Sequence, residues 1–178
     1  MKTIVNNVMD ELIINKSRFI GYLFKVNNID EINDILKKIK QEYRDATHIC
    51  YAYSLINSKK ANDDGEPSGT AGIPILEVFN KQELVNILGI VIRYFGGIKL
   101  GSGGLIRAYS NTIRNTLDKT NIKELKKGYL IKITFDYQRN NLINSLLENY
   151  EVIEKEFNER KESKVKLCID WKPALSNE

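Results

Sequence analysis

The chain has 178 residues, of which 42% are hydrophobic and 28% are charged, proportions ordinary for a folded soluble protein. Its 27 basic and 23 acidic residues give a net charge of +4, which permits contact with RNA but falls short of a dedicated nucleic-acid binder. No uncharged apolar run approaches the ~20 residues that cross a bilayer, and residues 1–16 lack a signal-peptide core, so we expect a cytoplasmic protein without membrane contact.

Two strands and a helix are expected at the start of the chain. Residues 11–14 and 18–26 are rich in Ile, Phe, Tyr and Val, and the polar residues between them indicate a turn. Over residues 29–43 the apolar side chains recur at steps of three and four, which predicts an amphipathic helix. Asn28 or Asp30 is its candidate N-cap.

The middle of the chain combines apolar segments with a long polar loop. Residues 48–56 have strand character, and residues 57–70 predict a loop of about fourteen residues, a length that is often functional. A short helix is expected over residues 72–80. Residues 86–94 are nearly all apolar, which predicts a central strand covered on both faces.

A glycine-rich loop at residues 96–104 follows this strand directly and leads into a second long helix. The predicted buried face of that helix consists of Leu105, Ile106, Tyr109, Ile113 and Leu117. Its opposite face carries three polar side chains at steps of four and three: Arg107, Asn111 and Arg114.

A domain boundary is expected within residues 120–128, which are polar and basic. The predicted domains are therefore residues 1–122 and 128–178. In the second domain, strands are expected over residues 129–135, 152–157 and 165–169. Between the first two strands, a helix is expected with the apolar face Leu142, Ile143, Leu146, Leu147 and Tyr150.

The glycine-rich loop is the most informative candidate site. Its glycines allow close backbone approach, and the helix start behind it offers unpaired N–H groups and a partial positive charge. Arg93, Lys99 and Arg107 would add charge to such an anion site. The loop is neither a Walker A sequence nor a dinucleotide fingerprint. The alternative is that the glycines only shape a tight turn and let the helix pack closely.

An acidic loop is the second candidate site. Asp63, Asp64 and Glu66 lie within four residues, and carboxylates of this kind bind Mg²⁺ or perform acid–base chemistry when burial separates their pKa values. The alternative is a solvated turn, or carboxylates that pair with Arg93 or Arg107 and thereby fix the loop.

The one histidine and the two cysteines are expected to be non-catalytic. Strand alternation places His48 and Cys50 on one face, where neighbouring side chains point in parallel rather than at each other, which disfavours a nucleophilic pair. His48 is then either a polar residue at the edge of a binding surface or a structural histidine. Cys50 and Cys168 lie in apolar strands without metal-ligand spacing and are expected to be buried, reduced thiols.

Several further side chains are weaker candidates for contact with RNA. Lys16 and Arg18 would contact phosphate or would simply be solvated. The aromatic residues considered for stacking on bases are Tyr51, Tyr53, Tyr94 and Tyr109, for which core packing is the preferred interpretation.

Four sequence blocks, at residues 16–19, 48–52, 63–72 and 91–109, together resemble the signature of the IMPACT/YigZ family. The resemblance implies an α+β protein whose first part has the ribosomal protein S5 domain 2-like fold, seen also in domain IV of elongation factor G. Its second part would be ferredoxin-like, similar to domain V of that factor. Eukaryotic relatives regulate a kinase pathway of translational control through an additional RWD domain, which we do not find here. For bacterial members the family implies a link to nucleic acid or the ribosome.

The second domain departs from the full ferredoxin-like pattern, βαββαβ. The sequence predicts strand, helix, strand, strand, and the chain ends at residues 171–178. We expect the domain to be truncated or to be completed by another copy of the chain, because an exposed sheet edge invites such pairing.

The leading functional hypothesis is a non-catalytic, translation-associated protein that binds RNA or the ribosome through the glycine-rich anion site. No catalytic residue, metal or cofactor is assigned. The alternatives are an enzyme acting on a phosphorylated small molecule or nucleotide, and a protein–protein interaction module in translational regulation. The predicted anion-binding residues are Arg93, Lys99, Gly101, Ser102, Gly103, Gly104, Arg107, His48, Lys16 and Arg18.

Overall fold

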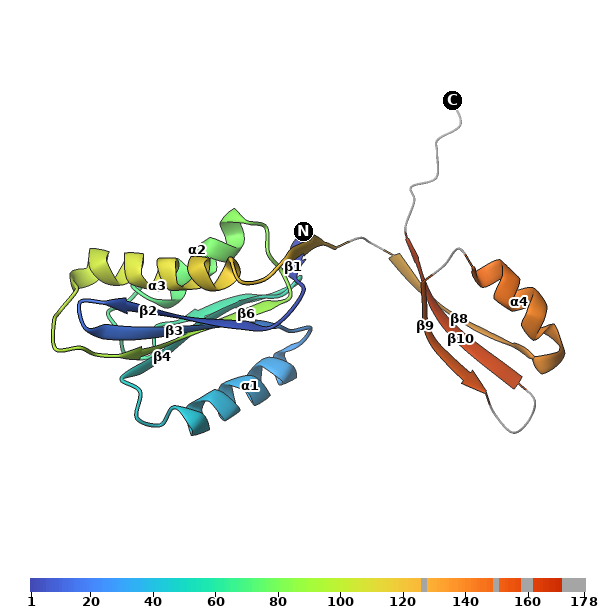
Figure 1. Ribbon diagram of the computed structural model, residues 1–178, viewed down its shortest axis with the longest axis horizontal. Helices are drawn as coiled ribbons and strands as arrows, with labels where there is room; N and C mark the ends of the chain where they lie inside the picture. The colour runs from blue at the N-terminus through green and yellow to red at the C-terminus, as the bar shows by residue number, and fades with distance from the viewer. Residues whose placement is uncertain (126–127, 149–150, 158–161, 171–178) are drawn as a thin grey trace, which may run out of the picture. The chain divides into compact units, whose positions relative to one another are not determined.

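A computed structural model describes residues 1–125, 128–148, 151–157 and 162–170 as a mixed α+β protein (Figure 1). The chain divides into two compact units, Met1–Leu125 and Lys126–Glu178, called unit 1 and unit 2 below. The division falls inside the basic stretch 120–128. Among the described residues, no helix is both long and apolar enough to cross a membrane.

Unit 1 is built on a five-stranded antiparallel sheet in the order β2-β3-β6-β4-β5. Its central strand β6 is buried from Ile87 to Arg93, which confirms the predicted strand covered on both faces. The strands are β2 (Val8–Ile14), β3 (Ser17–Lys25), β4 (His48–Ser54), β5 (Lys59–Asn62) and β6 (Ile87–Tyr94).

Three helices cover the two faces of this sheet (Figure 1). They are α1 (Ile29–Glu42), α2 (Gly72–Lys81) and α3 (Gly101–Leu117). α1 packs on one face over a core that includes Ile20, Ile32 and Ile90. α2 and α3 pack on the other face over a second core that includes Phe19, Phe79 and Tyr109. Each fully buried side chain of this size contributes about 1.5–3 kcal/mol through its removal from water.

The start of α1 follows the predicted cap. The Asn28 side chain accepts a hydrogen bond from the Glu31 N–H at 2.9 Å, and the Glu31 carboxylate accepts one from the Asn27 N–H at 2.9 Å. The structure therefore selects Asn28 rather than Asp30 as the N-cap, in a reciprocal arrangement of the capping-box kind.

Three short strands were not predicted. β5 lies inside the segment 57–70 that the sequence pattern assigned to a loop, and β1 (Lys2–Ile4) pairs with β7 (Ile122–Glu124) in a two-stranded sheet. Each of these strands has three or four residues, too few to establish an alternating pattern.

The predicted buried face of α3 is wrong at Ile106, which is 41% exposed. The buried stripe runs instead through Ala108, Thr112 and Thr116. The two threonine hydroxyls donate to backbone carbonyls four residues earlier, at 2.8 and 2.7 Å, so these polar side chains are satisfied in the core. Gly21 of β3 has no side chain to collide with Thr112 and Thr116, which allows the close approach.

Unit 2 contains a three-stranded antiparallel sheet in the order β8-β10-β9. Its helix α4 packs Ile143 and Leu147 against Ile133, Phe135 and Val152. The elements are β8 (Gly128–Asp136), the 3-10 turn η1 (Tyr137–Arg139), α4 (Asn140–Leu147), β9 (Glu151–Phe157) and β10 (Glu162–Asp170).

The predicted apolar face of this helix is wrong at two positions. Leu142 is 63% exposed and Leu146 is 60% exposed, because only the side of α4 that carries Ile143 and Leu147 packs against β8 and β9. Tyr150, residues 171–178 and the side chain of Cys168 lie outside what the structure describes. The expected completion of unit 2 by another copy of the chain therefore stays a prediction.

Candidate functional site

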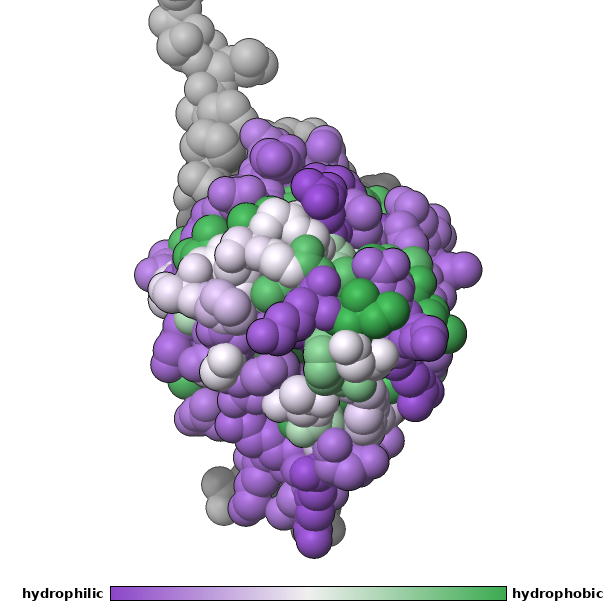
Figure 2. All heavy atoms as spheres, turned by 90° about the vertical axis from the view of Figure 1, so that its left-hand side faces the viewer, coloured by the Kyte–Doolittle hydropathy of each residue, from purple (hydrophilic) through white to green (hydrophobic). Residues whose placement is uncertain are grey.

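A pocket of about 450 Å³ opens where β6 ends and α3 begins. It brings together six of the predicted site residues: His48, Glu66, Arg93, Lys99, Gly101 and Ser102. Figure 2 views unit 1 from the end at which α3 starts, where hydrophobic and intermediate residues gather within a hydrophilic surround. The pocket lining combines apolar side chains, among them Phe95 and Leu105, with converging polar and charged groups, as ligand sites do.

The glycine-rich loop forms one wall of this pocket because it can turn where other residues cannot. Gly97 and Gly101 have φ angles of 83° and 69°, in the left-handed region. Gly96 lies against the backbone of Lys16, with which any side chain at position 96 would collide. The turn delivers the chain directly into α3.

The first turn of α3 carries no side-chain cap. Leu100 occupies the N-cap position and makes no capping hydrogen bond, and Gly101, Ser102 and Gly103 are exposed. The first amides of a helix have no partner within the helix, and the helix dipole places about half a positive charge there. This end of α3 therefore presents N–H donors to the pocket.

Arg93 lies at the base of the pocket and is only 5% exposed. Its Nη1 donates to Glu66 Oε1 at 2.5 Å, and its Nη2 donates to Ser17 Oγ at 3.5 Å. The guanidinium lies between the rings of Phe19 and Phe95, 5.4 and 5.5 Å from their centroids. Its Nε is buried without a hydrogen-bond partner among the described residues.

Glu66 is the hub of a buried polar network behind this arginine. Besides Arg93, its Oε1 accepts a hydrogen bond from the Tyr109 hydroxyl at 2.8 Å, and its Oε2 lies 3.9 Å from His48 Nε2. His48 Nδ1 lies 2.8 Å from the carbonyl oxygen of Asp64, which only accepts, so Nδ1 carries the proton. Burial raises the pKa of Tyr109, which keeps its hydroxyl a donor.

Cys50 belongs to the same buried cluster, and its thiol has polar partners there. Its sulfur lies 3.0 Å from the carbonyl oxygen of Asp63 and 3.3 Å from the Tyr109 hydroxyl. Burial raises the pKa of Cys50 to about 12, so the neutral thiol persists at physiological pH. The expectation of a buried thiol is confirmed for Cys50.

The carboxylates of the acidic loop accept hydrogen bonds from the protein itself and thereby hold the loop in place; they do not converge on one point where a ligand could bind. Asp63 accepts backbone hydrogen bonds from Gly69 at 2.8 Å, from Ala71 at 3.0 Å and from Gly72 at 2.8 Å, and so caps the start of α2. Burial alone would raise the pKa of Asp63, but these three amides lower it overall. Asp63 is therefore a structural residue of the loop.

The other two acidic residues also have internal partners. Asp64 Oδ2 accepts from the Ile49 N–H at 2.7 Å, and Glu66 pairs with Arg93. Within the part of the chain that the structure describes, no group of three or more His, Cys, Asp or Glu residues could hold a metal ion. The geometry agrees with the alternative in which carboxylates fix the loop.

Besides Asp63 and Asp64, five predicted residues lie outside the pocket lining. Gly103 and Gly104 lie in the first turn of α3, and Arg107 is exposed on the following turn, close to Gly103. Arg18 pairs with Glu11 at 2.8 Å on the outside of the sheet. Lys16 is exposed in the β2–β3 turn.

Five lining residues were not predicted: Thr47, Pro67, Phe95, Leu100 and Leu105. Phe95 is the most informative of them, because it is 46% exposed and lines the same pocket as the side chains of Arg93 and Lys99. The sequence did carry a signal for this residue, which stands directly between the buried strand and the first glycine of the loop. Core packing does not require an aromatic side chain at such a position, so Phe95 could have been chosen as a candidate site residue.

Comparison with known proteins agrees with the sequence blocks. The Impact N-terminal domain family matches residues 15–117. YvyE, an IMPACT family member of Bacillus subtilis, is 46% identical over 130 residues, which cover 71% of this chain and 60% of that protein. An IMPACT family member of Haemophilus influenzae is 38% identical over 146 residues, covering 78% of this chain and 70% of that protein.

A solved structure described as that of a hypothetical protein has a fold similar to that of this chain. It is 26% identical, with a TM-score of 0.69, over 94% of this chain and 84% of that chain. This chain spans 60% of the length of the Bacillus subtilis relative, so the similarity concerns part of that protein. The family match covers more than half of the chain, and the chain belongs to the IMPACT family.

Proposed function

We propose that this IMPACT family member is a non-catalytic, translation-associated protein of the cytoplasm that binds backbone phosphate of RNA, free or within the ribosome. The binding site is the pocket at the start of α3. The observation that carries the proposal is the uncapped first turn of α3, which opens into the same pocket as Lys99. Backbone N–H groups at a helix start, joined by a nearby cation, are a recurrent phosphate site in proteins.

The balance of charge in the pocket favours an anion. Glu66 is the one acidic residue in the lining, and its charge is offset by Arg93 in direct contact. Lys99 is exposed and makes no ion pair with any described residue. The lysine and the helix dipole therefore determine the sign of the local potential.

The two arginines have different roles in this proposal. Arg93 is committed to Glu66, so it positions the pocket wall rather than holding phosphate. Arg107 forms no ion pair with the described residues and lies one turn from the start of α3, where it extends the phosphate contact along the helix. Phosphate contacts of this kind fix position and carry no sequence information.

We also propose that the two units have the folds implied by the family resemblance, S5 domain 2-like and ferredoxin-like. In unit 2, β8 and β9 flank β10, and both run antiparallel to it. β8, α4 and β9 thus form a split βαβ unit with the next strand inserted between its strands, which supports the ferredoxin-like assignment.

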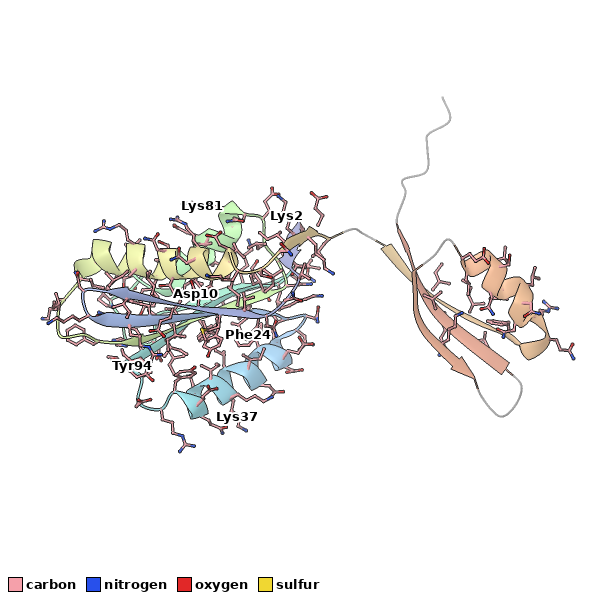
Figure 3. The ribbon with its side chains drawn as sticks, viewed as in Figure 1. Lys2, Asp10, Phe24, Lys37, Lys81 and Tyr94 are labelled. Carbon is pink, nitrogen blue, oxygen red and sulfur yellow. The ribbon has the colours of Figure 1, made fainter. Side chains whose placement is uncertain are left out.

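Binding to single-stranded RNA of several sequences, followed by fluorescence anisotropy at increasing salt, tests the function. We expect Lys99→Ala and Arg107→Ala each to weaken binding uniformly across sequences and to reduce the slope of log K against log salt by about 0.7–1. Lys37→Ala is the matched control, because Lys37 lies on α1, on the opposite face of the sheet from α3 (Figure 3). If both site variants bind as the wild type does, the proposal is wrong.

A second candidate function is favoured by the size of the pocket. A volume of about 450 Å³ is within the range of small-molecule sites, which would suit an enzyme acting on a phosphorylated metabolite or nucleotide. Thermal unfolding in the presence of a panel of nucleotides and Mg²⁺ distinguishes this enzyme from the proposed RNA-binding protein. A raised melting temperature with one nucleotide supports the enzyme, and unchanged melting across the panel argues against it.

A further inference from the structure

Phe95 is a large aromatic side chain that remains 46% exposed beside the candidate anion site. It lines the same pocket as Lys99, Gly101 and Ser102. A single exposed apolar residue is ordinary on a protein surface. An aromatic ring that shares a concave surface with phosphate-binding groups is different, because a nucleotide offers a phosphate and a planar base together.

The backbone around Phe95 is held firmly on both sides. The Phe95 N–H donates to Thr47 Oγ1 at 3.0 Å, and the Gly96 N–H donates to Ser17 Oγ at 3.1 Å. Gly96 is also in close contact with the backbone of Lys16, which fixes the path of the chain. A ring carried by such a segment binds without the cost of ordering a flexible loop.

The ring of Phe95 is also supported from the protein interior. The buried guanidinium of Arg93 lies over it, 5.5 Å from the centroid, and Glu66 holds that guanidinium in turn. Because the guanidinium occupies one face of the ring, a planar ligand has the opposite face to stack on. The hydrogen bonds of Arg93 Nη1 to Glu66 and of its Nη2 to Ser17 hold the guanidinium beside the ring.

We propose that Phe95 stacks on the base of an unpaired nucleotide whose phosphate is bound by Lys99 and the first amides of α3. The inference rests on the proposed RNA-binding function and narrows its ligand to single-stranded RNA. In a duplex the bases are already stacked on each other, and an aromatic side chain has no open base face to contact. Stacking on one aromatic residue tolerates any base, so little sequence preference accompanies it.

The test compares a short labelled oligoadenylate with an abasic ribose-phosphate oligomer of equal length. Phe95→Leu keeps an apolar side chain but removes the ring, and we expect it to bind oligoadenylate about tenfold more weakly or worse. Phe95→Trp should bind at least as well as the wild type. Neither variant should change binding of the abasic oligomer. Ile73→Ala, at a residue of equal exposure on α2, is the control and should bind both oligomers normally.

The outcomes separate this inference from the proposed function. If Phe95→Leu binds oligoadenylate as tightly as the wild type while Lys99→Ala weakens it, the stacking role is wrong and the phosphate site stands. If Lys99→Ala changes neither oligomer, the phosphate site itself is wrong. If AMP competes as strongly as an equal concentration of oligoadenylate nucleotides, the stacked ligand is a free nucleotide and the assignment to RNA is overturned.

Discussion

At the scale of single residues, Asp63 shows how a polar loop is held in place. Its two carboxylate oxygens accept three backbone hydrogen bonds from the segment that leads into α2. Hydrogen bonds to a charged group contribute about 1.5–3 kcal/mol each. We expect Asp63→Asn to lower the free energy of unfolding by about 2 kcal/mol. Urea denaturation measures this, with Asp34→Asn on the exposed side of α1 as the control, and equal losses in the two variants would contradict it.

The same carboxylate predicts a dependence of stability on pH. Because the pKa of Asp63 is lower in the folded chain than its ordinary value of 3.8, its ionised form stabilises the fold above that value. The contribution is lost as the pH falls below 3.8 toward the folded pKa. The difference in unfolding free energy between the wild type and Asp63→Asn should therefore shrink below that pH, and a constant difference would contradict the assignment.

Cys50 gives a chemical test of the buried network. Because burial raises its pKa to about 12, the folded chain holds almost no Cys50 thiolate at neutral pH. We expect iodoacetamide to leave Cys50 unmodified in the native protein and to alkylate it in urea, as measured by peptide mass spectrometry. Alkylation of native Cys50 at the rate of a free thiol would show that the cluster opens to solvent.

The sequence identified the charged part of the pocket but not its apolar part. Arg93, Lys99 and His48 could be selected because their charge or chemistry is unusual in their position. Leu100 and Leu105 could not, since an apolar residue beside a helix start has the same pattern whether it lines a pocket or a core. Phe95 was not considered for stacking on bases, and for the four tyrosines that were, core packing was preferred; of these, Tyr109 is fully buried.

At the scale of elements, Gly96 fixes the junction between the β2–β3 turn and the end of β6. Any side chain there would collide with the backbone of Lys16, which has little freedom to move. We expect Gly96→Ala to destabilise the fold by about 1–3 kcal/mol, as overpacking does. Gly103→Ala is the control, because the space there is open apart from the end of the Arg107 side chain and alanine favours the helix. Thermal unfolding distinguishes them, and equal effects would contradict this reading of Gly96.

Long elements with a strong pattern were predicted well, and short ones were not. The apolar run of β6 and the periodic helices α1 and α3 carry their own signal in the sequence. β1 and β7 are stabilised by pairing with each other, although almost all of unit 1 separates them in the sequence. A pairing between such distant segments leaves no local pattern from which either strand could be predicted. Ile106 was misassigned because Thr112 and Thr116 satisfy their hydroxyls inside α3 and occupy the buried stripe.

At the scale of the whole molecule, unit 1 contains two cores of its own, one on each face of its sheet. The pairing of β1 with β7 joins the first and the last strand of this unit. We therefore expect residues 1–125 to fold alone and to unfold cooperatively, and to retain the RNA affinity attributed to the pocket. Circular dichroism and denaturation of that fragment check this, and a fragment without a cooperative transition would contradict it.

The most direct measurement of the central claim is a ¹H–¹⁵N NMR titration of the full chain with short single-stranded RNA. If the start of α3 binds phosphate, the amide signals of Gly101, Ser102, Gly103 and Gly104 should shift saturably, and added salt should reverse the shifts. In Lys99→Ala the same signals should need a higher RNA concentration to reach half of their full shift, because one phosphate contact is lost. Binding that shifts other amides and leaves those four unchanged would contradict the account.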